Sequence, residues 1–254
     1  MNQLRDARGV SLVELMVATL IFSVVAAFGM RFLVLQHGWA VYQEDVAEAQ
    51  QQARAALDLM GRELSIVGFG VPEGDAKILM ATEKEVEFLT NMDKEITHLT
   101  AEAREGQKQL SVNGEEFEQG QDFEKGKTIS ICTLDYCKRH TLARDGTKTR
   151  LELNEGLIEG FPIGSAVQVV NQVRYALKAV DRTQFNLNRT VDNGRPAPVA
   201  EGLASMELEY LDGAGRPATD LTDIHRIWIQ LTARMPRTPE KVRSLVSEVY
   251  LRNR

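Results

Sequence analysis

Long apolar runs are scarce in this chain of 254 residues, and only one occurs, close to the amino terminus. A protein that crosses a membrane several times is therefore excluded, and a single span is expected. Positive charge is also in deficit, because 30 Lys and Arg stand against 36 Asp and Glu, a formal net charge of −6. Such a balance does not favour non-specific binding to nucleic acid, and we expect no nucleic-acid partner.

Catalytic and metal-binding patterns are missing as well. The chain has no Gly-x-Ser-x-Gly, no phosphate-binding glycine loop and no His-Glu-x-x-His. Asp212, with Asp220 and Asp223 nearby, suggests a calcium loop, but the spacing differs from an EF-hand and aspartate with glycine also forms ordinary tight turns. We therefore expect no enzyme activity, no cofactor and no metal site. The four histidines are scattered: His37, His98, His140 and His225.

Cysteine is limited to Cys132 and Cys137, with four residues between them. If this part of the chain faces an oxidising compartment, the pair favours a structural disulfide that closes a small hairpin. The alternative is half of a metal site, but His140 is the only further ligand nearby.

Proline is absent before Pro72, and charge is absent between Glu14 and Arg31. The apolar residues 15–30 cover about 24 Å at 1.5 Å per residue, close to the thickness of a bilayer. We predict a membrane-spanning helical segment over residues 10–35 and an amphipathic continuation over 36–68, ending near the glycines before Pro72. One stripe of this continuation is apolar: Trp39, Val46, Ala49, Ala53, Ala56, Leu57, Met60 and Leu64.

Arg5 and Arg8 precede the apolar run, which places the amino terminus on the cytoplasmic side and the large remainder outside. An ordinary secretory signal cleaved near Ala26 is one alternative, and a plain membrane anchor with an incidental glutamate is another. Glu14 counts against the secretory signal, because the core of such a signal would not carry a carboxylate. A carboxylate is expensive in lipid and by default indicates a function that needs a partner.

The stretch from Arg8 to Leu15 resembles the type IV prepilin signal, which type II secretion pseudopilins also use. The resemblance lies in a short basic leader ending in Gly9, a glutamate five residues later and an apolar helix. It implies a leader over residues 1–9, cleavage after Gly9 by a prepilin peptidase, and N-methylation of the new terminus at Val10. The commonest residue at that position in the family is phenylalanine, so this chain departs from the pattern there.

In a helical filament of such subunits, Glu14 would lie among apolar helices, where a carboxylate must be neutralised or paired. The amino group of Val10 in an adjacent subunit is the natural partner, and it is freed only by cleavage. We therefore predict that Glu14 is the residue that directs assembly.

After Pro72 the pattern changes to strands. We expect Glu85–Thr90 to pair with 96–99, loops with short strands over 101–127, and a turn at Asp145–Gly146 that joins two strands as a hairpin. The longest strand is predicted at 165–180, where alternate residues are mostly apolar. The other expected strands are 128–133, 136–144, 149–153, 183–191, 206–210, 227–233 and 242–251.

These features predict an α+β fold that is type IV pilin-like: a long amino-terminal helix, half in the membrane, packed on an antiparallel β-rich domain over residues 69–254. Segments 61–64, 68–70, 199–203 and 250–253 resemble PilW-type minor pilins. That resemblance implies a single-pass inner-membrane protein with a periplasmic domain, which then enters a pilus or its tip. The implied partners are other minor and major pilins, prepilin peptidase and the pilus assembly machinery. A J-type pseudopilin of type II secretion, or a membrane-tethered enzyme or binding module, remains the alternative.

Overall fold

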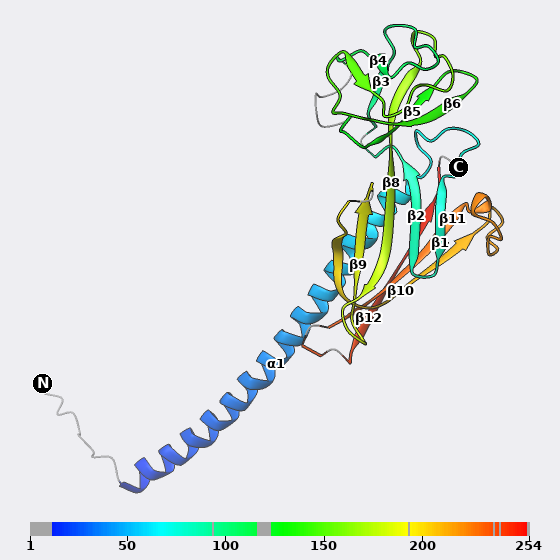
Figure 1. Ribbon diagram of the computed structural model, residues 1–254. Coiled ribbons are helices and arrows are strands. Elements are labelled where there is room, and N and C mark those ends of the chain that lie inside the picture. Colours follow the sequence, from blue (N-terminus) through cyan, green and yellow to red (C-terminus); the bar gives the residue numbers. More distant parts are fainter. Residues whose placement is uncertain are drawn as a thin grey trace, which may run out of the picture. The chain divides into compact units, whose positions relative to one another are not determined.

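A computed structural model describes residues 12–92, 94–115, 123–192, 194–235, 237–238 and 240–252. The chain divides into two compact units, Met1–Glu48 and Ala49–Arg254, and each is described by itself. One helix, α1 (Leu12–Ser65), runs through the boundary between them. All the strands belong to the second unit (Figure 1).

The first unit consists of the apolar part of α1, which is long and apolar enough to cross a membrane. Large apolar side chains are exposed along its whole length, as in Phe22 (72% exposed) and Val34 (73%). Two hydroxyls within it bond to the preceding helical turn: Thr19 donates to the Leu15 carbonyl (2.5 Å) and Ser23 to that of Thr19 (2.7 Å). Neither hydroxyl therefore needs water, as a lipid-facing helix requires.

The second half of α1 packs against the sheet within the second unit. The buried residues at steps of one, three and four form one face of the helix, as predicted. They are Ala49, Ala53, Ala56, Leu57, Met60 and Leu64. Trp39 and Val46 do not belong to this buried face, contrary to the prediction. Both lie in the first unit, where Trp39 is 68% exposed.

Two glycines with positive φ end the helical course of the chain, Gly68 (φ 79°) and Gly70 (φ 73°). Gly70 is also tightly packed, because a Cβ there would lie 2.8 Å from Cβ of Asn91 and 2.9 Å from Oε1 of Gln168. A side chain at this position would meet both a strained backbone and a clash. The turn after Ser65 thus depends on glycine, as the glycine-then-proline stop predicted.

The strands form an antiparallel sheet with the path β1-β2-β8-β9-β10-β11-β12, and β3, β5 and β6 branch from it through β8. The branch is β3 (Ile96–His98), β5 (Thr128–Cys132) and β6 (Cys137–Thr141). A second small sheet pairs β4 (Gln109–Ser111) with β7 (Arg150–Glu152), and a short 3-10 helix, η1, covers Leu221–Asp223. The main path is β1 (Ile78–Thr82), β2 (Glu85–Thr90), β8 (Ala166–Ala179), β9 (Phe185–Val191), β10 (Ala197–Leu211), β11 (Arg226–Arg234) and β12 (Val242–Tyr250).

Strand β8 passes through two lobes of the second unit (Figure 1). Its residues 166–170 pair with β3 and β5, and residues 171–179 pair with β2 and β9. Each lobe has its own hydrophobic core. We call the lobe that contains the end of α1 the helix lobe, and the lobe that contains residues 96–165 the cysteine lobe.

The structure confirms the α+β pilin-like fold and corrects several details. Segment 96–98 pairs with β8 and not with 85–90, because the chain leaves the helix lobe after Thr90. Strand β7 forms its ladder with β4, which is one of the short strands expected within 101–127. The segments on either side of Asp145–Gly146 still pair antiparallel, but only through the isolated bridges Leu142–Leu153 and Thr147–Arg150, so the expected hairpin is confirmed in part. The longest strand is β10, which is one residue longer than β8.

Candidate functional site: the amino-terminal helix and its polar anchor

Glu14 lies at the start of the described part of α1, on an exposed face. None of the interactions found among the described residues involves its carboxylate. The processing residues Gly9 and Val10, and with them the methylation site, lie outside the described residues.

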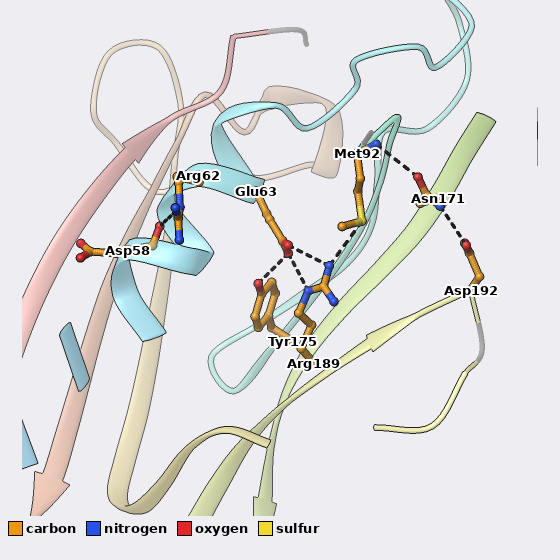
Figure 2. A network of polar contacts seen from close by, with 8 residues as sticks. All are labelled: Asp58, Arg62, Glu63, Met92, Asn171, Tyr175, Arg189 and Asp192. Carbon is orange, nitrogen blue, oxygen red and sulfur yellow. Dashed lines mark hydrogen bonds and ion pairs between the residues drawn. The ribbon is translucent and has the colours of Figure 1, made fainter. Parts of the chain in front are cut away.

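A buried polar network holds the other end of α1 to the sheet (Figure 2). Glu63 is 8% exposed and directs its carboxylate towards β8 and β9. The Tyr175 hydroxyl donates to its Oε2 at 2.6 Å, and Nε of Arg189 donates to the same oxygen at 3.0 Å. Nη2 of Arg189 lies 2.8 Å from the other oxygen, so arginine contacts both oxygens in a bidentate pair.

The charges of this network are mutually compensated. Burial, reinforced by the Glu63 carboxylate, raises the pKa of Tyr175 well above its ordinary value, so the hydroxyl remains a donor. Burial alone would lower the pKa of Arg189. The hydrogen bond and the negative charge of Glu63 act in the opposite direction and are stronger together, so the net pKa of Arg189 is raised. The end of α1 is thus held to the sheet by the Glu63 carboxylate, which pairs with the permanently charged Arg189 of β9.

The network continues towards the junction of the two lobes. Arg189 donates to Sδ of Met92 at 3.4 Å, and the Met92 amide donates to Oδ1 of Asn171 at 3.2 Å. Nδ2 of Asn171 donates to Asp192 at 2.9 Å, and Asp192 has a positive φ of 51°. Since Asn171 follows the residues of β8 that pair with β5, the helix end and the junction are connected through polar contacts.

Sequence reasoning missed this network. The sequence places Glu63 in the family-like segment 61–64, and Tyr175 at a mostly apolar alternate position of the strand expected at 165–180. One signal was available, because Glu63 lies three residues after Met60 and beside Leu64, on the buried face of the helix. An acid on such a face requires a buried partner, but the sequence does not identify Arg189 as that partner.

Cys132 and Cys137 form a disulfide, as predicted. The two residues are also opposite each other in the β5–β6 ladder, so the bridge closes the end of that hairpin. The alternative of half a metal site is overturned, because both sulfurs are in the bridge. No group of three or more His, Cys, Asp or Glu suited to a metal occurs among the described residues.

The Asp212 turn, considered for calcium, is satisfied by the protein itself. Its carboxylate accepts hydrogen bonds from the amides of Ala214 (2.8 Å) and Arg216 (2.9 Å). Nη2 of Arg216 also lies 2.9 Å from it. This is the geometry of a tight turn with an adjacent cation.

His140 is buried in the cysteine lobe at 8% exposure, and its Nε2 has no hydrogen-bond partner in the part of the chain that the structure describes. Burial lowers its pKa below 6.5, and the charge of Glu155 opposes this only in part. Below pH 6.5 the unfolded chain therefore binds a proton that the folded chain does not, so stability rises with pH there. We expect the free energy of unfolding to be constant above about pH 7 and to fall as the pH drops through 6.5.

Urea unfolding of the wild type and of His140→Gln at pH 5 and pH 7.5 measures this effect. The variant should lose part of the pH dependence, and His98→Gln, which changes an exposed histidine in the same lobe, should keep it. An identical slope in the wild type and His140→Gln would contradict the assignment.

A comparison with protein-family models found a match in the amino-terminal part of the chain. Residues 4–30 match the model described as the prokaryotic N-terminal methylation motif. No curated protein matches the chain. The motif implies processing by prepilin peptidase and association with pilins and their assembly system. Together with the apolar helix and the antiparallel domain, it supports a type IV pilin or pseudopilin.

Proposed function

We propose that this chain is a PilW-type minor pilin that takes part in initiating type IV pilus assembly, and that it acts as a structural subunit and not as an enzyme. The observation that carries the proposal is the methylation motif over residues 4–30, joined without interruption to an apolar helix. Leader removal after Gly9 would free the amine of Val10. The helix would then pass from the inner membrane into a filament, with Glu14 against the amine of a neighbouring subunit.

Two features of α1 support a role for the chain as a filament subunit whose domain carries contacts. The apolar first part of α1 suits lipid and also the packed interior of a helical filament, since both lack water. The second part is fixed to the sheet by its buried face and by Glu63. The periplasmic domain would then supply side-by-side contacts with other minor and major pilins.

The test is a strain that lacks the gene, combined with mass spectrometry of sheared filaments from the parent strain. We expect loss of twitching motility, normal export of secreted enzymes, and a filament-associated protein whose first residue is Val10 with an added methyl group. Restoration by the wild-type gene is the control. Retained twitching with loss of exported enzymes would favour a J-type pseudopilin instead, because that family shares the helix and the closing strands. A mature chain that begins near Ala26 would contradict both assignments.

A further inference from the structure

The disulfide-closed loop displays a leucine that its own lobe leaves uncovered. Leu134 is 104% exposed, although the loop around it is well fixed. The Thr133 hydroxyl accepts hydrogen bonds from the amides of Asp135 (3.2 Å) and Tyr136 (3.1 Å), and the Tyr136 hydroxyl donates to the Gly160 carbonyl at 2.5 Å. A loop that is already ordered loses little conformational entropy on binding, which favours a role in recognition.

The same loop carries a negative charge beside the leucine. Asp135 is exposed, and in the described residues its carboxylate has no ion pair or hydrogen bond. The loop therefore presents an apolar side chain and an uncompensated carboxylate at adjacent positions. A partner for it needs an apolar recess with a cation at the edge.

The helix lobe contains a recess of this kind. A pocket of about 430 Å³ lies between the segment after α1, β1, η1 and the end of β12, and this volume is typical of ligand-binding sites. Its wall includes Leu221, which is 40% exposed. The floor consists of buried apolar side chains: Val67, Ile78, Ile224 and Leu251.

Lys77 supplies the cation. It lines the pocket and is half-buried, and no described side chain forms an ion pair with it. The acid in the same wall, Asp75, is already paired with Arg139 at 2.8 Å. One positive charge at the pocket is thus left uncompensated, next to an apolar floor.

In this structure the loop does not occupy the pocket of its own chain, because Leu134 is 104% exposed. Ile78 in the pocket is opposite Phe88, which is opposite Val173 of β8. Cys132, at the base of the loop, is opposite Ala166 at the start of the same strand. Seven residues of strand separate these positions, or roughly 23 Å. Arg139 of the same hairpin contacts Asp75 in the pocket wall, but the Leu134 side chain stays outside the pocket. The pocket is therefore open to the loop of another molecule.

We propose that the Leu134–Asp135 tip of one copy docks in the pocket of a second copy, with leucine on the apolar floor and the Asp135 carboxylate beside Lys77. Because the two surfaces are different and displaced along β8, the contact is head-to-tail and can repeat in a row. The interface is small, so it forms where the helices already concentrate the chains in a membrane or a filament. It goes beyond the proposed function, because it requires two copies in one assembly and does not involve Glu14.

The test uses two full-length copies with different epitope tags in one membrane. The first copy carries a photoreactive benzoylphenylalanine in place of Leu134, and the second is unmodified. We expect a light-dependent adduct between the two tagged chains that maps by mass spectrometry to 67–78 or 221–224. Lys77→Glu in the second copy should lower the yield about fivefold, and Asp135→Lys in the first copy should restore it.

Two matched controls separate docking from proximity and misfolding. Lys84→Glu makes the same charge change at an exposed lysine outside the pocket and should leave the yield unchanged. The photoreactive residue at Val180, which is 62% exposed at the other end of β8, should give no adduct with the pocket. The proposal is overturned if the residue at 134 labels only other proteins or another surface, if no adduct forms, or if Lys77→Glu has no effect. These outcomes leave the filament and motility results of the proposed function unchanged, so the two can fail separately.

Discussion

A Glu14→Ala chain is expected to be cleaved at Gly9 as efficiently as the wild type and to be missing from filaments. In the proposed function, cleavage would act on the leader, whereas assembly would bury residue 14 among apolar helices. There the amine of Val10 in a neighbouring subunit would lose its counter-charge. Removing one partner of a buried charge pair costs about 2–5 kcal/mol, so incorporation should fall by more than tenfold.

The measurement is the ratio of the protein in sheared filaments to that in the membrane, with the amino-terminal mass as a check on processing. Glu14→Gln, which keeps the size and loses the charge, should also be excluded. Glu48→Ala removes an exposed acid from the same helix and is the matched control. Normal incorporation of Glu14→Ala would refute the charge-pair model of assembly.

Replacing Arg189 by methionine is expected to lower the free energy of unfolding of the domain by about 3 kcal/mol. The substitution keeps the apolar stem but leaves the Glu63 carboxylate buried at 8% exposure with only the Tyr175 hydroxyl as donor. Tyr175→Phe should cost less, about 1–1.5 kcal/mol, because it removes one neutral donor and the ion pair remains.

Urea unfolding of the full chain in detergent, followed by circular dichroism, measures both effects. The double variant Glu63→Leu with Arg189→Met should recover most of the loss, because no unpaired charge stays buried. Arg104→Met is the control, since Arg104 lies 3.9 Å from Glu102 in a pair whose side chains are 82% and 66% exposed. That change should cost under about 0.5 kcal/mol. Equal effects of Arg104→Met and Arg189→Met would contradict the anchoring role of the network.

The helix could be predicted because its signals are local. The absence of proline before Pro72, the charge-free run and the glycines at 68 and 70 each act within a few residues of the chain. The buried stripe from Ala49 to Leu64 followed from periodicity alone. Trp39 was misassigned because periodicity identifies a face of a helix and not the point at which a partner begins to cover it.

Strand pairing was less predictable because the information is not local. Segment 96–98 follows 85–90 closely, which favours a hairpin, yet both pair with β8. Strand β10 was expected only over 206–210, because Pro198 and Gly202 in its first half are typical strand breakers. The ladder accommodates them by register shifts between Pro198 and Leu203. Strand β1 was missed because only Ile78 of its five residues is buried, so it has no alternating pattern.

The residues of the candidate site also differ in whether their signal is local in the sequence. Glu14 and the cysteine pair are conspicuous in the sequence because each stands out from its neighbours. The Glu63 network joins residues more than a hundred positions apart, and each member has an ordinary neighbourhood in the chain. Likewise, the pocket beside Lys77 combines segments around residues 67–78, 221–224 and 251, which only the folded chain brings together.

The passage of β8 through both lobes affects how the domain would respond to a pulling force. Its backbone is continuous through both lobes, and its hydrogen bonds to β2, β5 and β9 lie across the strand direction. Tension along β8 therefore loads these bonds in shear, many at once, instead of unzipping them singly. A retracting fibre that pulled on such a subunit would stretch both lobes as one body before either gave way.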